Sequence, residues 1–235
     1  MPWHAKPTGY YARTTQEAID NAREVYNVLY GLGWCLESVC AALGNMEHES
    51  GYNPWRWQGD VVLPVGDPRI GTIGGGNTAH AYGLCQQDPA AKYIYRPYAQ
   101  SLPYYGPNYS DQQGNLKDGQ PQLQYIHWIC SDPNGGEWDS DTSHSIYNMP
   151  FADFIVNRNN QTILYLTRTF FYGYERGTWN QTRVTAANYW LHELGGYTPV
   201  PPAEEDAVWF GVLHALKKKK QQGVYYRKRH KGWWY

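Results

Sequence analysis

Two glutamates, Glu47 and Glu49, lie two residues apart immediately before a break in the chain at Gly51 and Asn53-Pro54. On a helix, residues two apart point about 200° apart, so one carboxyl can face the apolar side while the other faces water. A carboxyl held against apolar neighbours has a raised pKa, which a general acid working near neutral pH requires. The pair therefore indicates acid catalysis by one member. The alternative is that both are solvated glutamates of an ordinary helix end.

The residues that precede the glutamates predict an amphipathic helix that carries both in its last turn. Its apolar positions recur at three- and four-residue spacing, at Leu36, Val39, Cys40, Leu43 and Met46. Gly51 and Pro54 are expected to end it. A first helix is predicted over residues 15–30, where Thr14 and Glu17 have the spacing of a capping box. Further helices are predicted over residues 121–131, 150–156, 158–174, 181–194 and, beyond a Gly- and Pro-rich linker, 203–219.

Composition favours one domain with an electrostatically distinct tail. The 235 residues suffice for one sizeable core. The 22 Tyr and 11 Trp, against 5 Phe, carry polar groups of the kind found at wet interfaces, polysaccharide grooves included. Residues 1–216 hold 12 basic and all 21 acidic residues, whereas residues 217–235 hold 8 basic residues and no acid. We expect this tail to be solvated or bound to an acidic partner, and we do not expect a nucleic-acid partner.

The cysteines and glycines predict neither a cofactor nor a metal site. Cys35, Cys40, Cys85 and Cys130 show no CxxC spacing and are expected to be free thiols. Cys35 and Cys40, five apart on one predicted helix, are too distant for a relaxed disulfide. The run at residues 74–76 lacks a phosphate-binding pattern and is interpreted as a flexible turn. No apolar segment has the form of a signal peptide or of a membrane span.

Three segments, in order along the chain, carry a resemblance to a known family. They are Glu49-Ser50-Gly51-Tyr52-Asn53-Pro54, then Tyr82-Gly83-Leu84-Cys85-Gln86 with Asp88 two residues later, then Tyr174-Glu175-Arg176. Over residues 15–195 the sequence resembles the bacteriophage tail lysozymes, and more distantly the goose-type lysozymes and soluble lytic transglycosylases. In these families a glutamate at a helix end precedes a serine, and a G-L-x-Q segment lies on a facing hairpin.

The resemblance implies a fold and a division of the chain. The fold is mainly α (α+β lysozyme-like), with a helical catalytic domain at residues 15–195 and a small β-hairpin or loop region that lines the cleft. An irregular lead-in occupies residues 1–14. Residues 196–235 form a Pro-rich linker, an amphipathic helix and a basic, aromatic tail.

The resemblance also implies a role for each matched residue. Glu49 matches the general acid, and Asp88 falls where an acid positions or deprotonates the attacking water, with Asp60 as its rival. Glu47 has no matching role and is expected on the solvent side. The residues expected to bind substrate are Ser50, Tyr52, Trp57, Tyr82, Gly83, Leu84, Gln86, Tyr174 and Glu175.

The resemblance implies cleavage of the β-1,4 bond between MurNAc and GlcNAc in peptidoglycan. This reaction requires a general acid, because a glycosidic oxygen is a poor leaving group unless it is protonated. Two details have structural alternatives. The aromatic side chains around the motifs could fill the core instead of stacking on sugar rings. Glu175 could form a structural ion pair with Arg176.

Three other functions stay open. The same general acid would serve a lytic transglycosylase, in which a hydroxyl of the sugar replaces water as the nucleophile. A glycan-binding tail component could keep the fold without cutting. A cell-wall cysteine peptidase would use Cys85 as nucleophile and His127 or His144 as base. The resemblance implies a place in the virion tail or at the host cell wall, with peptidoglycan as partner and other virion proteins bound through residues 196–235.

Overall fold

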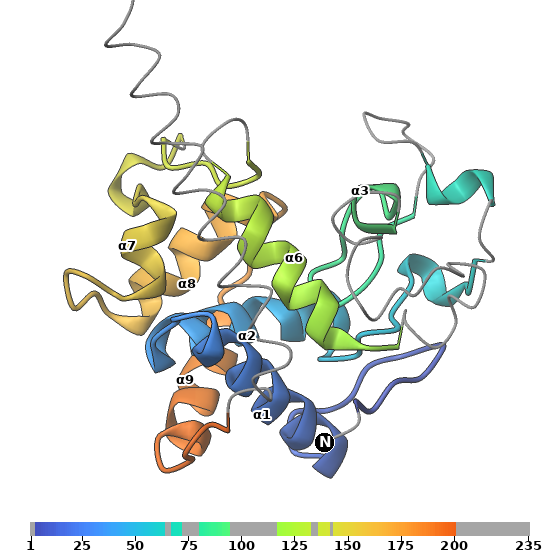
Figure 1. Ribbon diagram of the computed structural model, residues 1–235, viewed down its shortest axis with the longest axis horizontal. Coiled ribbons are helices and arrows are strands. Elements are labelled where there is room, and N and C mark those ends of the chain that lie inside the picture. The colour runs from blue at the N-terminus through green and yellow to red at the C-terminus, as the bar shows by residue number, and fades with distance from the viewer. Residues whose placement is uncertain are drawn as a thin grey trace, which may run out of the picture. The chain divides into compact units, whose positions relative to one another are not determined.

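The computed structural model describes residues 3–63, 67–71, 80–94, 117–132, 136–141 and 143–200 (Figure 1). The helices are α1 (Gln16–Gly31), α2 (Leu36–Ser50), α3 (Ala91–Ile94), α6 (Gly119–Ser131), α7 (Phe151–Ile155), α8 (Ile163–Phe170) and α9 (Thr182–Leu194). Short 3-10 turns occur at η1 (Gln58–Asp60), η2 (Pro68–Ile70) and η3 (Ser145–Tyr147), and a π-turn, η4, spans Phe171–Glu175. The predicted mainly α fold is confirmed. The predicted helix over residues 203–219, the basic tail and the glycine run at 74–76 lie outside the described residues.

Helix α2 is the central helix, because almost every residue from Ser38 to Met46 is buried and it contacts α1, α7, α8 and α9 (Figure 1). The closest approach is at Gly44. A Cβ at this position would lie 2.3 Å from the backbone oxygen of Arg183 and 2.8 Å from the Cβ of Ala187. Glycine is therefore required for α9 to lie directly against α2, with Arg183 beside the last turns of α2.

The predicted end of α2 is confirmed. Gly51 adopts the left-handed conformation (φ 57°, ψ 41°), and its N–H donates to the carbonyls of Glu47 and Met46. This is the usual glycine C-cap, and it leaves Glu47 and Glu49 in the last turn, as expected. The predicted start of α1 is one residue early, because Thr15 rather than Thr14 is the N-cap and accepts a hydrogen bond from the N–H of Ala18.

The helix predicted over residues 158–174 begins too late in the structure for the predicted start to hold, and its last turn is a π-turn rather than an α-helical one. Asn157 and Asn160 have positive φ angles and form a turn, and α8 begins only at Ile163, after the N-cap Thr162. At its C-terminal end α8 widens into the π-turn η4, which stops at Arg176 in the left-handed conformation. A π-turn holds one more residue than an α-helical turn, so it changes the direction in which the following side chains point.

In the described residues between α2 and α3, the region predicted as a small β-hairpin or loop contains two isolated antiparallel bridges, Trp57 with Tyr82 and Tyr82 with Gln87. Around them, the N–H of Gln58 donates to Ala81 O (2.9 Å) and the N–H of Gly83 donates to Arg56 O (2.9 Å). The two sequence motifs therefore face each other across a pair of extended segments. None of the helices in the described part of the chain is long and apolar enough to cross a membrane.

Candidate active site

Glu49 is held by an arginine from α9. Its Oε1 lies 2.5 Å from Nη2 of Arg183, and the exposed fractions of the two side chains are 23% and 2%. Arg183 also donates from Nη1 to the carbonyl and side-chain oxygens of Asn45, at 3.3 and 3.1 Å. Its guanidinium lies 4.8 Å from the ring centroid of Phe171. A buried guanidinium fixed on several sides is a rigid partner for a carboxylate that reaches the surface.

Glu175, at the end of η4, carries the carboxyl with the strongly raised pKa. Its Oε1 is buried and has no hydrogen-bond partner among the described residues. Burial, and next the charge of Glu49, raise the pKa of Glu175 to about 8, while Arg183 and a hydrogen bond with the Cys85 thiol act in the opposite direction. Glu175 therefore keeps its proton at neutral pH, whereas an ordinary glutamate would lose it.

Glu49 and Glu175 form a pair of interacting carboxyls in unlike surroundings. Glu49 forms an ion pair with a buried guanidinium, whereas Glu175 has a buried Oε1 without a hydrogen-bond partner among the described residues. Such a contrast separates acid from base roles in glycosidase sites. The sequence predicted Glu49 but missed Arg183. An available signal was its place beside Val184 and Ala187 on the apolar face of the helix predicted over 181–194.

Glu47 is half-buried and no more exposed than Glu49, so the prediction that it is the solvent-side member of the pair is wrong. Its side chain is 23% exposed, and its Oε1 lies 2.5 Å from Nη2 of Arg13. Tyr52 donates its hydroxyl hydrogen to the other oxygen, and Trp190 Nε1 donates to that hydroxyl at 2.7 Å. The residues before α1 cover this side of the helix end, which periodicity cannot reveal. His48, between the two glutamates, is the exposed residue of the turn, as expected.

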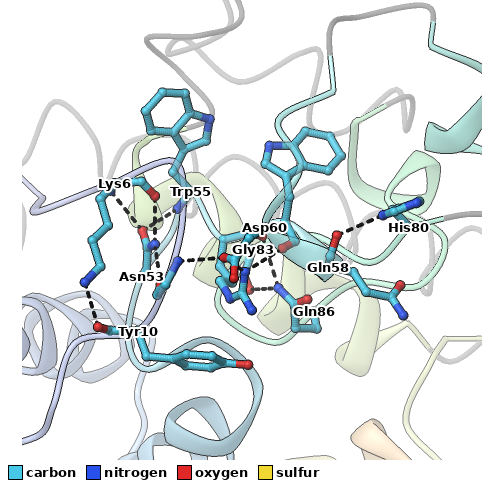
Figure 2. Close-up of polar contacts among 12 residues, drawn as sticks. Lys6, Tyr10, Asn53, Trp55, Gln58, Asp60, His80, Gly83 and Gln86 are labelled. Carbon is cyan, nitrogen blue, oxygen red and sulfur yellow. Dashed lines mark hydrogen bonds and ion pairs between the residues drawn. The ribbon is translucent and has the colours of Figure 1, made fainter.

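Asp60 and Asp88, the two candidates for the second carboxylate, differ in their contacts. Asp60 Oδ1 accepts a hydrogen bond from the backbone N–H of Gly9 at 2.6 Å and pairs with Arg56 (Figure 2). Asp60 is thus engaged in fastening loops together. Asp88 is exposed and precedes the cis peptide to Pro89. A role for Asp88 toward the attacking water stays a prediction.

The G-L-x-Q segment is a tight turn fixed by a residue that the sequence did not single out. Gly83 has a φ of 87°, and a Cβ on it would lie 2.4 Å from Oε1 of Gln122, on α6. The same Oε1 accepts from the N–H of Leu84 at 2.9 Å, and Nε2 of Gln122 donates to the carbonyl of Pro54 at 2.8 Å. Gln86 donates to the carbonyls of Arg56 and Gly83 (Figure 2). Gln122 therefore connects the two motifs; a glutamine on the buried face of the predicted helix 121–131 was the available signal.

Several residues expected to bind substrate are buried. Their relative exposure is zero for Ser50, Tyr52, Trp57, Tyr82 and Leu84. This burial fits the alternative that the aromatic residues pack in the core. The ring of Trp57 lies 4.7 Å from that of Tyr82, centroid to centroid. Trp55 keeps part of its surface and has Lys117 Nζ 4.2 Å from its ring centroid. Trp55 is therefore a partly exposed aromatic residue beside the first motif, with a lysine ammonium over its ring.

The late Tyr-Glu segment lies beside the second motif rather than forming the predicted ion pair. Tyr174 accepts a hydrogen bond from Nε2 of Gln87. Among the described residues, Arg176 donates to the carbonyls of Glu137 and Gly173 rather than to Glu175. The π-turn therefore brings the Glu175 carboxyl to Glu49 and directs Arg176 elsewhere.

The cysteines are free, as predicted. Cys85 is buried, and burial raises the pKa of its thiol well above the usual range, which is the reverse of what a nucleophilic cysteine requires. Of the two proposed bases, His127 accepts from Trp34 Nε1 through Nδ1 at 3.0 Å, and the His144 ring stacks on Tyr172 at 3.8 Å. The geometry does not support a Cys85 peptidase.

Comparison with known proteins places this geometry in a family. Residues 20–194 match the family described as phage tail lysozyme. Morphogenesis protein 1 of Bacillus phage B103 is 30% identical over 184 residues, which cover 77% of this chain and 41% of that relative. The chain thus spans about two fifths of the length of this relative.

Proposed function

The chain belongs to the phage tail lysozyme family, and from that premise we propose that it is a peptidoglycan glycosidase that cleaves the MurNAc–GlcNAc β-1,4 bond. The observation that carries the proposal is the Glu49 carboxyl at the end of α2, held by the buried guanidinium of Arg183 and interacting with the carboxyl of Glu175, whose pKa burial and the charge of Glu49 raise. A glycosidic bond breaks readily only when its leaving oxygen receives a proton. A carboxyl pair that retains one proton at neutral pH can supply it.

Glu49 is the member that delivers the proton. Its side chain reaches the surface, whereas Oε1 of Glu175 is enclosed. When the proton leaves, the carboxylate of Glu49 is stabilised by the guanidinium of Arg183, already 2.5 Å away. Glu175 takes the part of a proton-holding partner: its raised pKa keeps a proton on the pair, and this proton reaches the leaving oxygen through Glu49.

The nucleophile is water positioned by Asp88, or a hydroxyl of the sugar itself. Carboxyls about 6.5–9.5 Å apart leave room for a water and give inversion. Mass spectrometry of the products separates the two routes, because hydrolysis leaves reducing ends and transglycosylation leaves 1,6-anhydro ends. We expect reducing ends, and 1,6-anhydro ends would assign the chain to the transglycosylases.

The decisive experiment compares Glu49→Gln with Glu193→Gln in release of soluble fragments from purified peptidoglycan. The first change keeps the shape and removes the acid, so release should fall to near background. The second removes an exposed carboxylate on α9 and should leave release unchanged. Normal release by the first variant would refute the glycosidase proposal. Wild-type protein that binds peptidoglycan but never cuts it would identify a glycan-binding component.

We place the activity in a phage virion, where it would open the cell wall locally. The match to a phage morphogenesis protein supports this location. Residues 15–195 would form the catalytic domain, and residues 196–235 would bind other virion proteins. Deletion of residues 196–235 should then leave fragment release intact and abolish incorporation into particles, measured by immunoblotting of purified virions.

A further inference from the structure

The residues before α1 pack directly on the turn that follows Glu49. Residues 3–13, here called the strap, precede the part of the chain that matches the family, which begins at residue 20. The N–H of Tyr11 in the strap donates to the carbonyl of Gly51 at 3.2 Å. A Cβ on Gly51 would lie 2.7 Å from the Cβ of Tyr10. The strap and the turn therefore fit together with no room for another side chain.

Asn53 fastens the strap on the far side of the turn (Figure 2). Its side chain is fully buried. Oδ1 accepts from the N–H groups of Lys6 (3.2 Å) and Trp55 (3.1 Å), and Nδ2 donates to the carbonyls of Lys6 (2.8 Å) and Gly9 (3.2 Å). Every hydrogen-bonding position of this amide is used, and three of the four bonds go to the strap backbone.

Arg13 fastens the other side, on α2 itself. It forms the 2.5 Å ion pair with Glu47, which lies two residues before Glu49 in the same helical turn. Further along the turn, Asn21 Nδ2 donates both to the carbonyl of Tyr52 (2.8 Å) and to that of His4 in the strap (2.7 Å). The strap thus contacts the chain immediately before and immediately after Glu49.

The turn needs such contacts because Tyr52 has a φ of 62°, a conformation that residues other than glycine rarely adopt. A residue of this kind persists only when its surroundings determine it. Arg183 of α9 fixes one side of the last turns of α2 through Asn45 and Glu49. The strap is what fixes the other side.

We propose that the strap is a positioning device for Glu49: by holding Glu47 and residues 51–53 it keeps the Glu49 carboxyl aligned with Arg183 and the substrate. This inference rests on the proposed glycosidase function. Arg13 and Asn53 are positioning residues, since neither contacts Glu49 itself. A shift of about 1 Å in a catalytic group can cost about a hundredfold in rate.

The test uses the full chain with Arg13→Gln, Arg13→Lys and Asn53→Asp, the last being isosteric but placing a carboxylate oxygen against two carbonyls. The matched control is Arg158→Gln, which removes a 2.6 Å ion pair with Asp153 between α7 and α8. We expect Arg13→Gln to lower kcat about tenfold and Asn53→Asp about a hundredfold, with KM changed less than about twofold. Arg13→Lys should recover most of the loss, and the control should match wild type.

Two readouts separate positioning from general destabilisation and from failure of the glycosidase proposal. Amide hydrogen exchange at residues 51–53 should become faster in Arg13→Gln and Asn53→Asp, with α9 unchanged, whether or not the wild type cuts peptidoglycan. If residues 51–53 of these variants exchange their amide hydrogens as slowly as in the wild type, the proposed role of the strap is wrong. If the wild type cuts peptidoglycan, a kcat in these variants equal to that of wild type, or a change in KM alone, would also overturn the strap's role. If the variants exchange faster but the wild type does not cut peptidoglycan, the glycosidase proposal is refuted. The strap would then still be the support of this turn.

Discussion

The two sides of the C-terminal end of α2 carry matching ion pairs. On the α9 side Glu49 meets Arg183, and on the strap side Glu47 meets Arg13. Each N···O distance is 2.5 Å and each glutamate side chain is 23% exposed. Neither exposure nor pairing therefore separates a catalytic carboxyl from a structural one at this helix end.

The two ion pairs differ in the group that lies next to each glutamate. Beside Glu49 is a second carboxyl, Glu175, whose pKa burial and the charge of Glu49 raise to about 8. Beside Glu47 is the hydroxyl of Tyr52, itself held by Trp190. A neighbouring acid that keeps its proton can supply it to Glu49, whereas a tyrosine hydroxyl with a pKa raised by burial can only hold its partner in place.

The largest expected effect contrasts Glu49→Gln with Glu47→Gln. Loss of a general acid should lower kcat by about 10²–10⁴-fold or more. Glu47→Gln keeps an acceptor for Tyr52 and loses only the charge toward Arg13, so kcat should fall by about tenfold at most. The measurement is fragment release from purified peptidoglycan at saturating substrate. Equal losses in the two variants would break the comparison.

Gly44→Ala should disturb the α9 side alone. The added methyl would meet the backbone oxygen of Arg183 at 2.3 Å, so α9 must move and the variant should lose about 1–3 kcal/mol of stability or more. Gly196→Ala, which meets nothing within 4 Å, is the control. Thermal and denaturant unfolding report the cost. If Gly44→Ala were as stable as Gly196→Ala, α2 and α9 would be less closely packed at Gly44 than this distance requires.

Glu175→Gln sharpens the comparison through pH. In the wild type, activity should fall as the pH rises through about 8, when the carboxyl pair loses its proton. In the variant this alkaline limb should be displaced, because an amide does not titrate, and kcat at neutral pH should fall by about tenfold. An unchanged pH–rate profile would remove Glu175 from the mechanism.

The same group affects stability with a definite sign. The unfolded chain releases the proton of Glu175 near its ordinary pKa of 4.5, and the folded protein keeps it to about 8. Between these values the folded state binds more protons, so its stability should decrease as the pH rises. Thermal unfolding from pH 4.5 to 8.5 should show a steeper decline for wild type than for Glu175→Gln. Parallel curves would contradict the raised pKa.

The smallest expected effect is that of Cys85→Ser. The thiol is buried beside Glu175 and its raised pKa disfavours the nucleophilic thiolate, so we expect fragment release to stay within about threefold of wild type. A loss of a hundredfold or more would restore the cysteine peptidase hypothesis.

Features set by neighbouring residues could be predicted from the sequence, whereas contacts between distant segments could not. The end of α2 at Gly51 follows from a residue type and a periodic pattern, and both were correctly interpreted. The position of Glu47 depends on Arg13, 34 residues away, and no pattern within the helix encodes it. Gln122 links Pro54 with Leu84 by a side chain whose partners are 68 and 38 residues distant. Such contacts exist only once the elements have packed.

The end of α8 shows the same limit in another form. Leu166, Phe170 and Phe171 recur at helical spacing and are buried, whereas Ile163 and Tyr174 of the same apolar pattern are only half-buried. Periodicity does not show that the last turn widens, or that Gly173 in this turn lies against the ring of Trp138. The roles of Asp88 and of the residues after 200 stay predictions.

The π-turn at Phe171–Glu175 also has a meaning at the level of the gene. Each residue of an α-helix turns the chain by about 100°, so removal of one codon from this turn would restore the regular helix and swing Glu175 about a quarter of a turn away from Glu49. Insertion of one codon into a regular helix would do the opposite. The second carboxyl of this site is therefore one insertion or deletion away from being lost or acquired, without any change in the amino acids that form it.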